Sequence, residues 1–196
     1  MKRIDLVDRA KNIILTPKQE WELIDREEYE IKDIYTNYVM ILAAIPAVAG
    51  FLGFSIVPLG GYLSKYGIPI PAGIAHMVLD YVFGLGSVYI LALVIDGFAP
   101  TFGGEKNFLQ SMKLAAFSST AIWLAGVFFI LPALNILFLL GLYSLWLLWL
   151  GLPLLMNVHE DKRPAYFVVI AVMALVLHVV IRALTALTIP GPLRGF

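Results

Sequence analysis

Five long apolar runs constrain this chain more than any other feature. They lie near residues 38–59, 72–95, 113–131, 133–156 and 165–187. Each is long enough to cross a hydrocarbon core of about 30 Å, which takes roughly 20 helical residues. Lipid offers the backbone no hydrogen-bond partners, so such runs cross a membrane as helices. The sequence therefore predicts an all-α membrane protein with a five-span transmembrane helical bundle.

Charged residues divide the chain into two parts. Only 14% of all residues are charged, whereas soluble domains average about 25%. Residues 1–36 hold seven Lys/Arg and nine Asp/Glu, and the other 160 residues hold seven and five. This distribution predicts a polar, amphipathic N-terminal segment over 1–36 and a transmembrane domain over 37–196.

The positions of the basic residues predict the orientation. If the N-terminus is cytoplasmic, the inner side collects eleven Lys/Arg, namely seven from residues 1–36 together with Lys106, Lys113, Lys162 and Arg163. The outer side then holds three, which are Lys65, Arg182 and Arg194. Because inner loops are enriched in Lys and Arg, we expect a cytoplasmic N-terminus and an external C-terminus.

The N-terminal segment contains a helix-start signal. Thr16 stands in the N-cap position, Pro17 in the first helical position and Gln19 in the capping-box position. Trp21 and Ile24 then share one face of the expected helix. Such a helix lies either in the lipid headgroup region or on the inner ends of the bundle. Either arrangement shields Trp21 from water.

Four stretches carry a resemblance to a known family. They are "ILTPKQEWELI" (14–24), "YVMILAAIPAVAGFLG" (38–53), "YILALVIDGFAPTFGGEKN" (89–107) and "YSLWLLWLGLPLLMNVHEDK" (143–162). In these stretches the chain resembles the bacterial branch of the Yip family, multi-spanning membrane proteins named for interaction with Ypt/Rab GTPases. The resemblance implies five spans, a cytoplasmic N-terminus and a role in membrane organisation or traffic. We therefore expect a multi-pass protein of the cell inner membrane that acts as a scaffold or adaptor.

Two departures from the family pattern narrow the expected partners. Eukaryotic members carry an Asp-Leu-Tyr-Gly-Pro-like motif that residues 1–36 lack, which argues against a GTPase partner. The remaining partners are the lipid bilayer, other membrane proteins or a second copy of the chain. Relatives also tend to have proline where this chain has His159. A catalytic role for His159 is therefore not expected.

Two pairs of ionisable residues stand inside the predicted spans. His76 and Asp80 are four residues apart in the second span, as are His178 and Arg182 in the fifth. Residues at this spacing share one helix face. Counting from the predicted span ends at ~1.5 Å per residue places Asp80 level with His178, and His76 level with Arg182. The pattern predicts adjacent second and fifth spans with a polar cluster between them.

Three roles remain open for this cluster. Asp80 could form a structural salt bridge with Arg182 or a histidine. The four residues could relay protons through a small permease or channel. His76, Asp80 and His178 could also ligate a metal ion. Arg182 could instead extend to the outer surface and leave Asp80 to the histidines.

Two short loops on the expected cytoplasmic side carry the other notable polar residues. The first contains Asp96, Pro100, Gly103 and Gly104, and its glycines and proline exclude a plain helix. Asp96 needs a partner, and Lys106 or a backbone amide could supply it. The second contains Glu160, Asp161 and Lys162. These residues predict a solvated hinge that also offers a partner surface.

Several function classes find no support. Zero net charge gives no basic field for nucleic acid. The chain has no cysteine, no GxSxG elbow, no HExxH pair and no phosphate-binding Gly-rich loop, so we expect neither an enzyme nor a cofactor. The main alternative to a scaffold is a small permease or channel for a proton, metal ion or small solute that uses the cluster of His76, Asp80, His178 and Arg182.

Overall fold

The computed structural model describes residues 5–57 and 67–187, and every element in that part of the chain is helical. Two short helices come first, α1 (Leu6–Leu15) and α2 (Pro17–Arg26). Five helical units follow that are long and apolar enough to cross a membrane. This confirms the predicted all-α, five-span membrane fold.

Most spans are built from more than one helical segment. The first comprises α3 (Ile31–Ile34), η1 (Tyr35–Val39), α4 (Met40–Phe51) and η2 (Leu52–Ile56). The second comprises α5 (Ile70–Phe98) and η5 (Ala99–Phe102), and the third α6 (Phe108–Ser118), α7 (Thr120–Ala125) and η6 (Gly126–Ile130). The fourth comprises η7 (Pro132–Leu142) and α8 (Tyr143–Met156), and the fifth is α9 (Arg163–Ala186). The first span thus begins earlier than the sequence predicts, and its predicted end at 58–59 lies outside the described residues.

The third and fourth spans meet in a sharp turn at Leu131. Leu131 has an extended backbone (φ −117°, ψ 111°), and η7 begins at Pro132 immediately after it. A residue before proline is pushed out of the helical region, because the proline ring clashes with a helical neighbour. The two spans therefore run antiparallel and pack against each other through η6 and η7.

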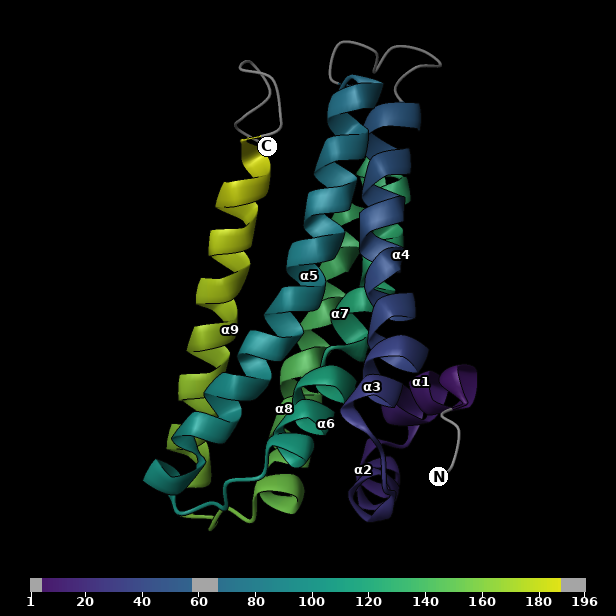
Figure 1. Ribbon diagram of the computed structural model, residues 1–196. Helices are drawn as coiled ribbons and strands as arrows, with labels where there is room; N and C mark the ends of the chain where they lie inside the picture. Colours follow the sequence, from purple (N-terminus) through teal and green to yellow (C-terminus); the bar gives the residue numbers. More distant parts are fainter. Residues whose placement is uncertain (1–4, 58–66, 188–196) are drawn as a thin grey trace.

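The five spans are enclosed to very different degrees. Figure 1 shows α5 between α4 and α9, with α6, α7 and α8 behind. In the third span 61% of the apolar window is buried, but in the fifth only 6% is. Helix α9 packs mainly on α5, with smaller contacts to α8 and η5, and leaves most of its surface for lipid.

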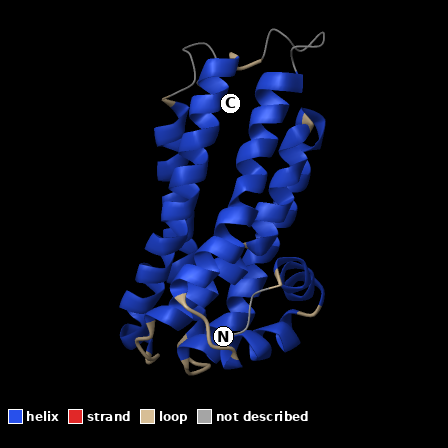
Figure 2. Ribbon diagram, turned by 45° about the vertical axis from the view of Figure 1, so that its right-hand side comes forward, coloured by secondary structure: helices blue, strands red, loops and turns tan. Residues whose placement is uncertain are grey.

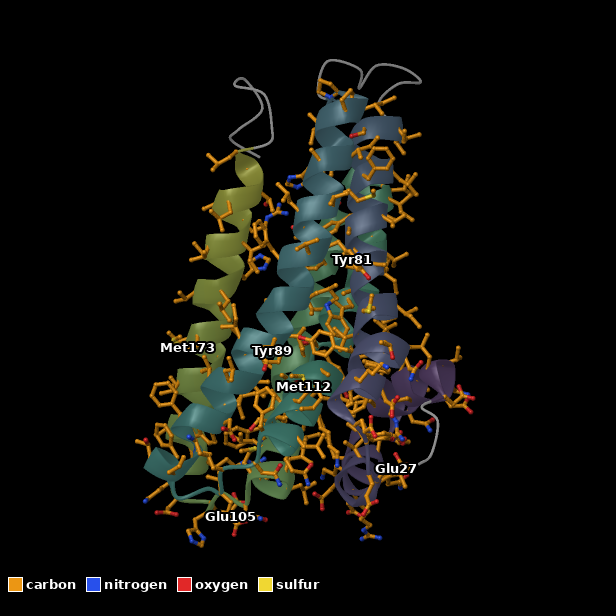
Figure 3. All side chains as sticks on the ribbon, viewed as in Figure 1. Glu27, Tyr81, Tyr89, Glu105, Met112 and Met173 are labelled. Atoms are coloured by element: carbon orange, nitrogen blue, oxygen red, sulfur yellow. The ribbon has the colours of Figure 1, made fainter. Side chains whose placement is uncertain are left out.

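Helices α1 and α2 lie across one end of the bundle, as Figures 1 and 2 show. Helix α2 packs on α8, and α1 packs on α2 and α7. Glu27 and Glu105 are both near this end of the molecule in Figure 3, away from the C-terminus. The polar parts of the described chain thus gather mainly at the N-terminal end of the bundle.

Candidate functional site

Trp21 fixes helix α2 to the bundle. Its side chain is fully buried, which confirms the predicted shielding. A Cβ placed on Gly151 of α8 would lie 2.8 Å from the indole ring and 2.8 Å from Leu114. Only glycine leaves room for this approach, so α2 packs closely on the spans. Of the two predicted environments for this helix, the structure favours the bundle end.

The start of α2 agrees only partly with the sequence pattern. Thr16 occupies the N-cap position and Pro17 opens the helix, as predicted. The expected capping bond is wrong, because Thr16 makes no side-chain bond to α2. Its hydroxyl donates instead to the carbonyl of Asn12 at 3.1 Å. That carbonyl belongs to the last turn of α1, which ends one residue before Thr16 and needs donors there.

A buried ionic group joins the N-terminal helices to each other. Arg9 is only 7% exposed and pairs with two carboxylates, Glu20 and Glu27. Its guanidinium also donates to the Tyr29 hydroxyl at 2.6 Å. The Tyr29 hydroxyl in turn donates to Glu27. Burial, and then the bond to Glu27, raise the pKa of Tyr29 well above its usual value, so the hydroxyl keeps the proton that it donates.

Lys113 joins this group to the third span. It is 2% exposed, and its Nζ donates to the carbonyls of Ile24 at 3.0 Å, Asp25 at 3.3 Å and Glu27 at 2.8 Å. These carbonyls close the C-terminal end of α2, where a cation is electrostatically favourable. We call Arg9, Glu20, Glu27, Tyr29 and Lys113 the N-terminal junction.

Sequence reasoning did not identify the N-terminal junction. Arg9 looked like a basic residue flanking an amphipathic helix, and Lys113 like a charge at the inner end of a span. One signal was available, because Lys113 is followed at once by the run "LAAF" without a loop. A lysine inside an apolar run needs polar partners. Nothing in the local pattern named α2 as their source.

The two loops at this end pack against each other. We call them the loop platform, defined as residues 99–107 and 157–162. The Glu105 amide donates to the Met156 carbonyl at 3.1 Å, and the Asn157 side chain bonds the Glu105 carboxylate at 3.4 Å. Beneath them the Phe102 ring stacks on Tyr166, with ring centroids 5.0 Å apart. Two segments far apart in sequence therefore form one surface.

Backbone geometry holds the loop platform in shape. Gly103 and Asn157 both have left-handed backbones, with φ of 74° and 50°. A Cβ on Gly104 would lie 2.6 Å from the Met156 carbonyl oxygen. Because that neighbour is backbone, it cannot rotate away. Gly103 is thus favoured by its left-handed backbone, and Gly104 is required by close packing between the loops.

The predicted loop residues fall into two groups in the structure. Pro100, Gly103, Glu160, Asp161 and Lys162 are exposed on the loop platform, and Gly104 is partly buried within it. Asp96 is different. Its Oδ1 is buried without a hydrogen-bond partner, and no ion pair joins it to Lys106 in the described residues. The predicted pairing of Asp96 with Lys106 is therefore wrong, and the Lys106 side chain is exposed instead.

The second and fifth spans are neighbours, as predicted. The His76 Nδ1 donates to the Thr185 carbonyl at 3.2 Å. Moving four residues along each antiparallel helix from this bond brings Asp80 beside residue 181, next to Arg182. The predicted alignment of Asp80 with His178, and of His76 with Arg182, is thus wrong by about one helical turn. It was counted from assumed span ends, and α5 begins at Ile70, before the predicted start.

We call His76, Asp80, His178 and Arg182 the α5–α9 seam. Arg182 and His178 stand one and two helical turns before Thr185 on α9, so they share the face that meets His76 of α5. Even so, Asp80 makes no ion pair with Arg182 in the described part of the chain. His178 and Arg182 are exposed, and Asp80 is partly so.

A metal site is not formed at the seam. Within residues 5–57 and 67–187, no three His, Cys, Asp or Glu side chains come close enough to hold a metal ion. The candidates His76, Asp80 and His178 are therefore not gathered as ligands. A shallow pocket of about 270 Å³ lies elsewhere, between the start of α2 and Trp146 and Leu150 of α8.

Comparison with known proteins identifies the family to which this chain belongs. The Yip1 domain matches residues 11–181 of this chain. The chain is 28% identical over 154 residues to the inner membrane protein YohC of Escherichia coli strain K12, which covers 74% of this chain and 77% of YohC. YohC of E. coli O6:H1 matches to the same extent. No solved structure matches the chain.

Proposed function

This chain belongs to the Yip1 family of membrane proteins, and from that premise we propose that it is a non-enzymatic scaffold or adaptor that organises partner proteins in the membrane. YohC, to which it is similar, is an inner membrane protein. We place this chain in the same membrane, with the N-terminal junction and the loop platform facing the cytoplasm. The support for that orientation is the excess of Lys and Arg at this end.

The loop platform is the observation that carries the proposal. Its two loops are fixed by main-chain contacts and stacked rings, while its charged side chains stay exposed. They are Glu105, Lys106, Glu160, Asp161 and Lys162. A preorganised surface loses little conformational freedom when a partner docks. Because acidic and basic groups alternate there, the surface suits a protein partner better than a polyanion.

The N-terminal junction supports the same reading. Its buried ion pairs hold α1 to α2, and Lys113 holds the end of α2 to the third span, so that segment extends the surface at the same end (Figure 3). A scaffold needs such a fixed outer shape and does not need a cavity.

A small permease is the second candidate function. The observation that favours it is the packing of α5, which carries His76 and Asp80, against α9, which carries His178 and Arg182, because ionisable residues within spans are costly and commonly functional. It predicts proton, metal-ion or solute flux across liposomes that contain the purified chain, and loss of that flux in Asp80→Asn.

Site-specific photo-crosslinking in membranes tests the scaffold. A photoreactive amino acid is placed at Lys106 or Asp161 of the loop platform and, as a control, at the lipid-facing Val172 of α9. We expect discrete protein adducts from the two platform positions only. Gly104→Val, which separates the loops, should remove them. Identical patterns at all three positions, together with flux that Asp80 controls, would favour the permease instead.

A further inference from the structure

The α5–α9 seam contains ionisable side chains that have no part in the proposed scaffold function. His76 and Asp80 share one face of α5, and Thr185 accepts the His76 hydrogen bond on α9. Arg182 and His178 precede Thr185 by three and seven residues, which is the spacing of one helix face. All of these side chains therefore face the space between the two helices.

The helices do not close over this space. Side chains at a tight helix contact are buried, yet His178 and Arg182 are exposed although they face α5. In Figure 1 the two ribbons are farther apart toward the C-terminal end of α9. Because His178 and Arg182 are exposed, both side chains are accessible from the surface that lipid covers.

The depth of the seam matches a lipid headgroup. Helix α9 has 24 residues, or roughly 36 Å at 1.5 Å per residue, against a hydrocarbon core of about 30 Å. If α9 is centred in the core, Arg182 and the level of Asp80 lie only about 3–5 Å inside its edge. Arg182 can reach the headgroups with its long side chain, but Asp80 is too short to do so. A carboxylate at this position needs a partner that comes to it.

The charges define the chemistry of that partner. Asp80 is an anion, Arg182 is a cation and His178 is a further polar group, and no ion pair joins the first two in the described residues. A phosphodiester suits a guanidinium with its fork of donors. A primary ammonium suits a carboxylate. A phosphoethanolamine group carries both, a few atoms apart.

We propose that the α5–α9 seam binds phosphatidylethanolamine from the outer leaflet, with its phosphate on Arg182 and its ammonium on Asp80. The acyl chains lie along exposed apolar side chains of α9, which include Leu175 and Val179. The choice of the outer leaflet rests on the orientation given under the proposed function, but the assignment does not depend on the scaffold role of the opposite end.

Lipid titration followed by native mass spectrometry tests the proposal on the full purified chain. The probes are phosphatidylethanolamine, phosphatidylcholine and phosphatidylglycerol with identical acyl chains, and water-soluble glycerophosphoethanolamine. We expect phosphatidylethanolamine to bind at least about tenfold more tightly than the other two lipids, because choline cannot donate a hydrogen bond to Asp80 and glycerol carries no cation.

Two neutral variants assign the contacts. Asp80→Asn should remove the preference for ethanolamine while phosphate affinity remains, and Arg182→Gln should weaken all three lipids alike. Glu30→Gln, an exposed position between α2 and α3, is the matched control and should not change lipid binding. Thermal unfolding of each variant shows that it is folded.

Four outcomes would overturn the assignment. The first is equal binding of the three lipids to the wild-type chain. The second is a preference that neither Asp80→Asn nor Arg182→Gln alters. The third is binding of glycerophosphoethanolamine as tight as that of the lipid, which would identify a soluble ester as the ligand. The fourth is a change of oligomeric state rather than of lipid binding in the two variants, which would assign the seam to a second copy of the chain.

Discussion

The N-terminal junction and the α5–α9 seam both contain acidic and basic side chains, but those of the junction are mostly buried and those of the seam are exposed or partly exposed. In the junction Arg9, Glu20 and Lys113 are almost fully buried, and each has a charged or carbonyl partner. In the seam Arg182 and His178 are exposed, and Asp80 has no ion pair in the described residues. A charge that is buried with its partners stabilises an arrangement of helices. A charge left open within a span is available to a ligand.

This difference also explains which helices are held firmly. The junction ties α1 and α2 to the most enclosed span, whereas α9 has the least buried surface of the five. We expect substitutions in the junction to act on folding, and substitutions in the seam to act on binding. The following changes test that division.

Replacement of Arg9 should have the largest effect. Arg9→Met leaves Glu20 and Glu27 buried without their cation, which should lower the free energy of unfolding by about 3–5 kcal/mol. The measurement is unfolding in detergent micelles by titration with a denaturing detergent, followed by tryptophan fluorescence. Lys11→Met, on the exposed side of α1, is the control and should change stability by less than about 0.5 kcal/mol. Equal losses in both variants would contradict a special role for the ion pairs.

Replacement of Lys113 should come next. Lys113→Met deprives three carbonyls at the end of α2 of their donor and should cost about 2–3 kcal/mol. Amide hydrogen exchange should accelerate in α2 more than in α8, because α2 loses its anchor at that end. Lys162→Met removes a lysine that is exposed on the loop platform and serves as the control. Unchanged exchange in α2 would show that Trp21 alone holds the helix.

A methyl group on Gly104 should disturb the loop platform. Gly104→Ala pushes against the Met156 carbonyl and should cost about 1–3 kcal/mol through overpacking. Gly97→Ala is a close control, because nothing lies within 4 Å of the Cβ that it adds. In a helix that change should be neutral or stabilise by up to about 1 kcal/mol. Similar effects of the two substitutions would mean that the loops do not pack as described.

Neutralisation of the seam should have the smallest effect on folding. Asp80→Asn keeps the shape of the side chain and removes a charge without an ion-pair partner, so stability in micelles should change by less than about 0.5 kcal/mol. The same unfolding titration measures it. A loss as large as that of Arg9→Met would show that Asp80 is paired within the chain and would make the seam a second junction.

The two regions also differ in how far the sequence could predict them. The seam was found from spacing, because His76 and Asp80, and His178 and Arg182, each share a helix face. Its register was wrong, since register depends on where helices begin and on which carbonyl meets His76. The junction was not found, because Arg9, Glu20 and Glu27 lie in a polar segment with many other charges, and because the partners of Lys113 come from α2, far from it in the sequence.

The sequence by itself therefore determined the features that follow from contact with lipid or water and from the periodicity of helices. Apolar runs of sufficient length require spanning helices, Pro132 requires a break, and the motifs through residue 162 point to the Yip family. Tertiary structure decided what each polar group meets. Lys113 is a cap for α2 only because Trp21 packs on Gly151 and brings the end of that helix to the third span. Asp80 keeps part of its surface exposed although α9 packs on α5. Such contacts join residues about 90 to 130 positions apart, and no local pattern encodes the distance between two helices that pack in space.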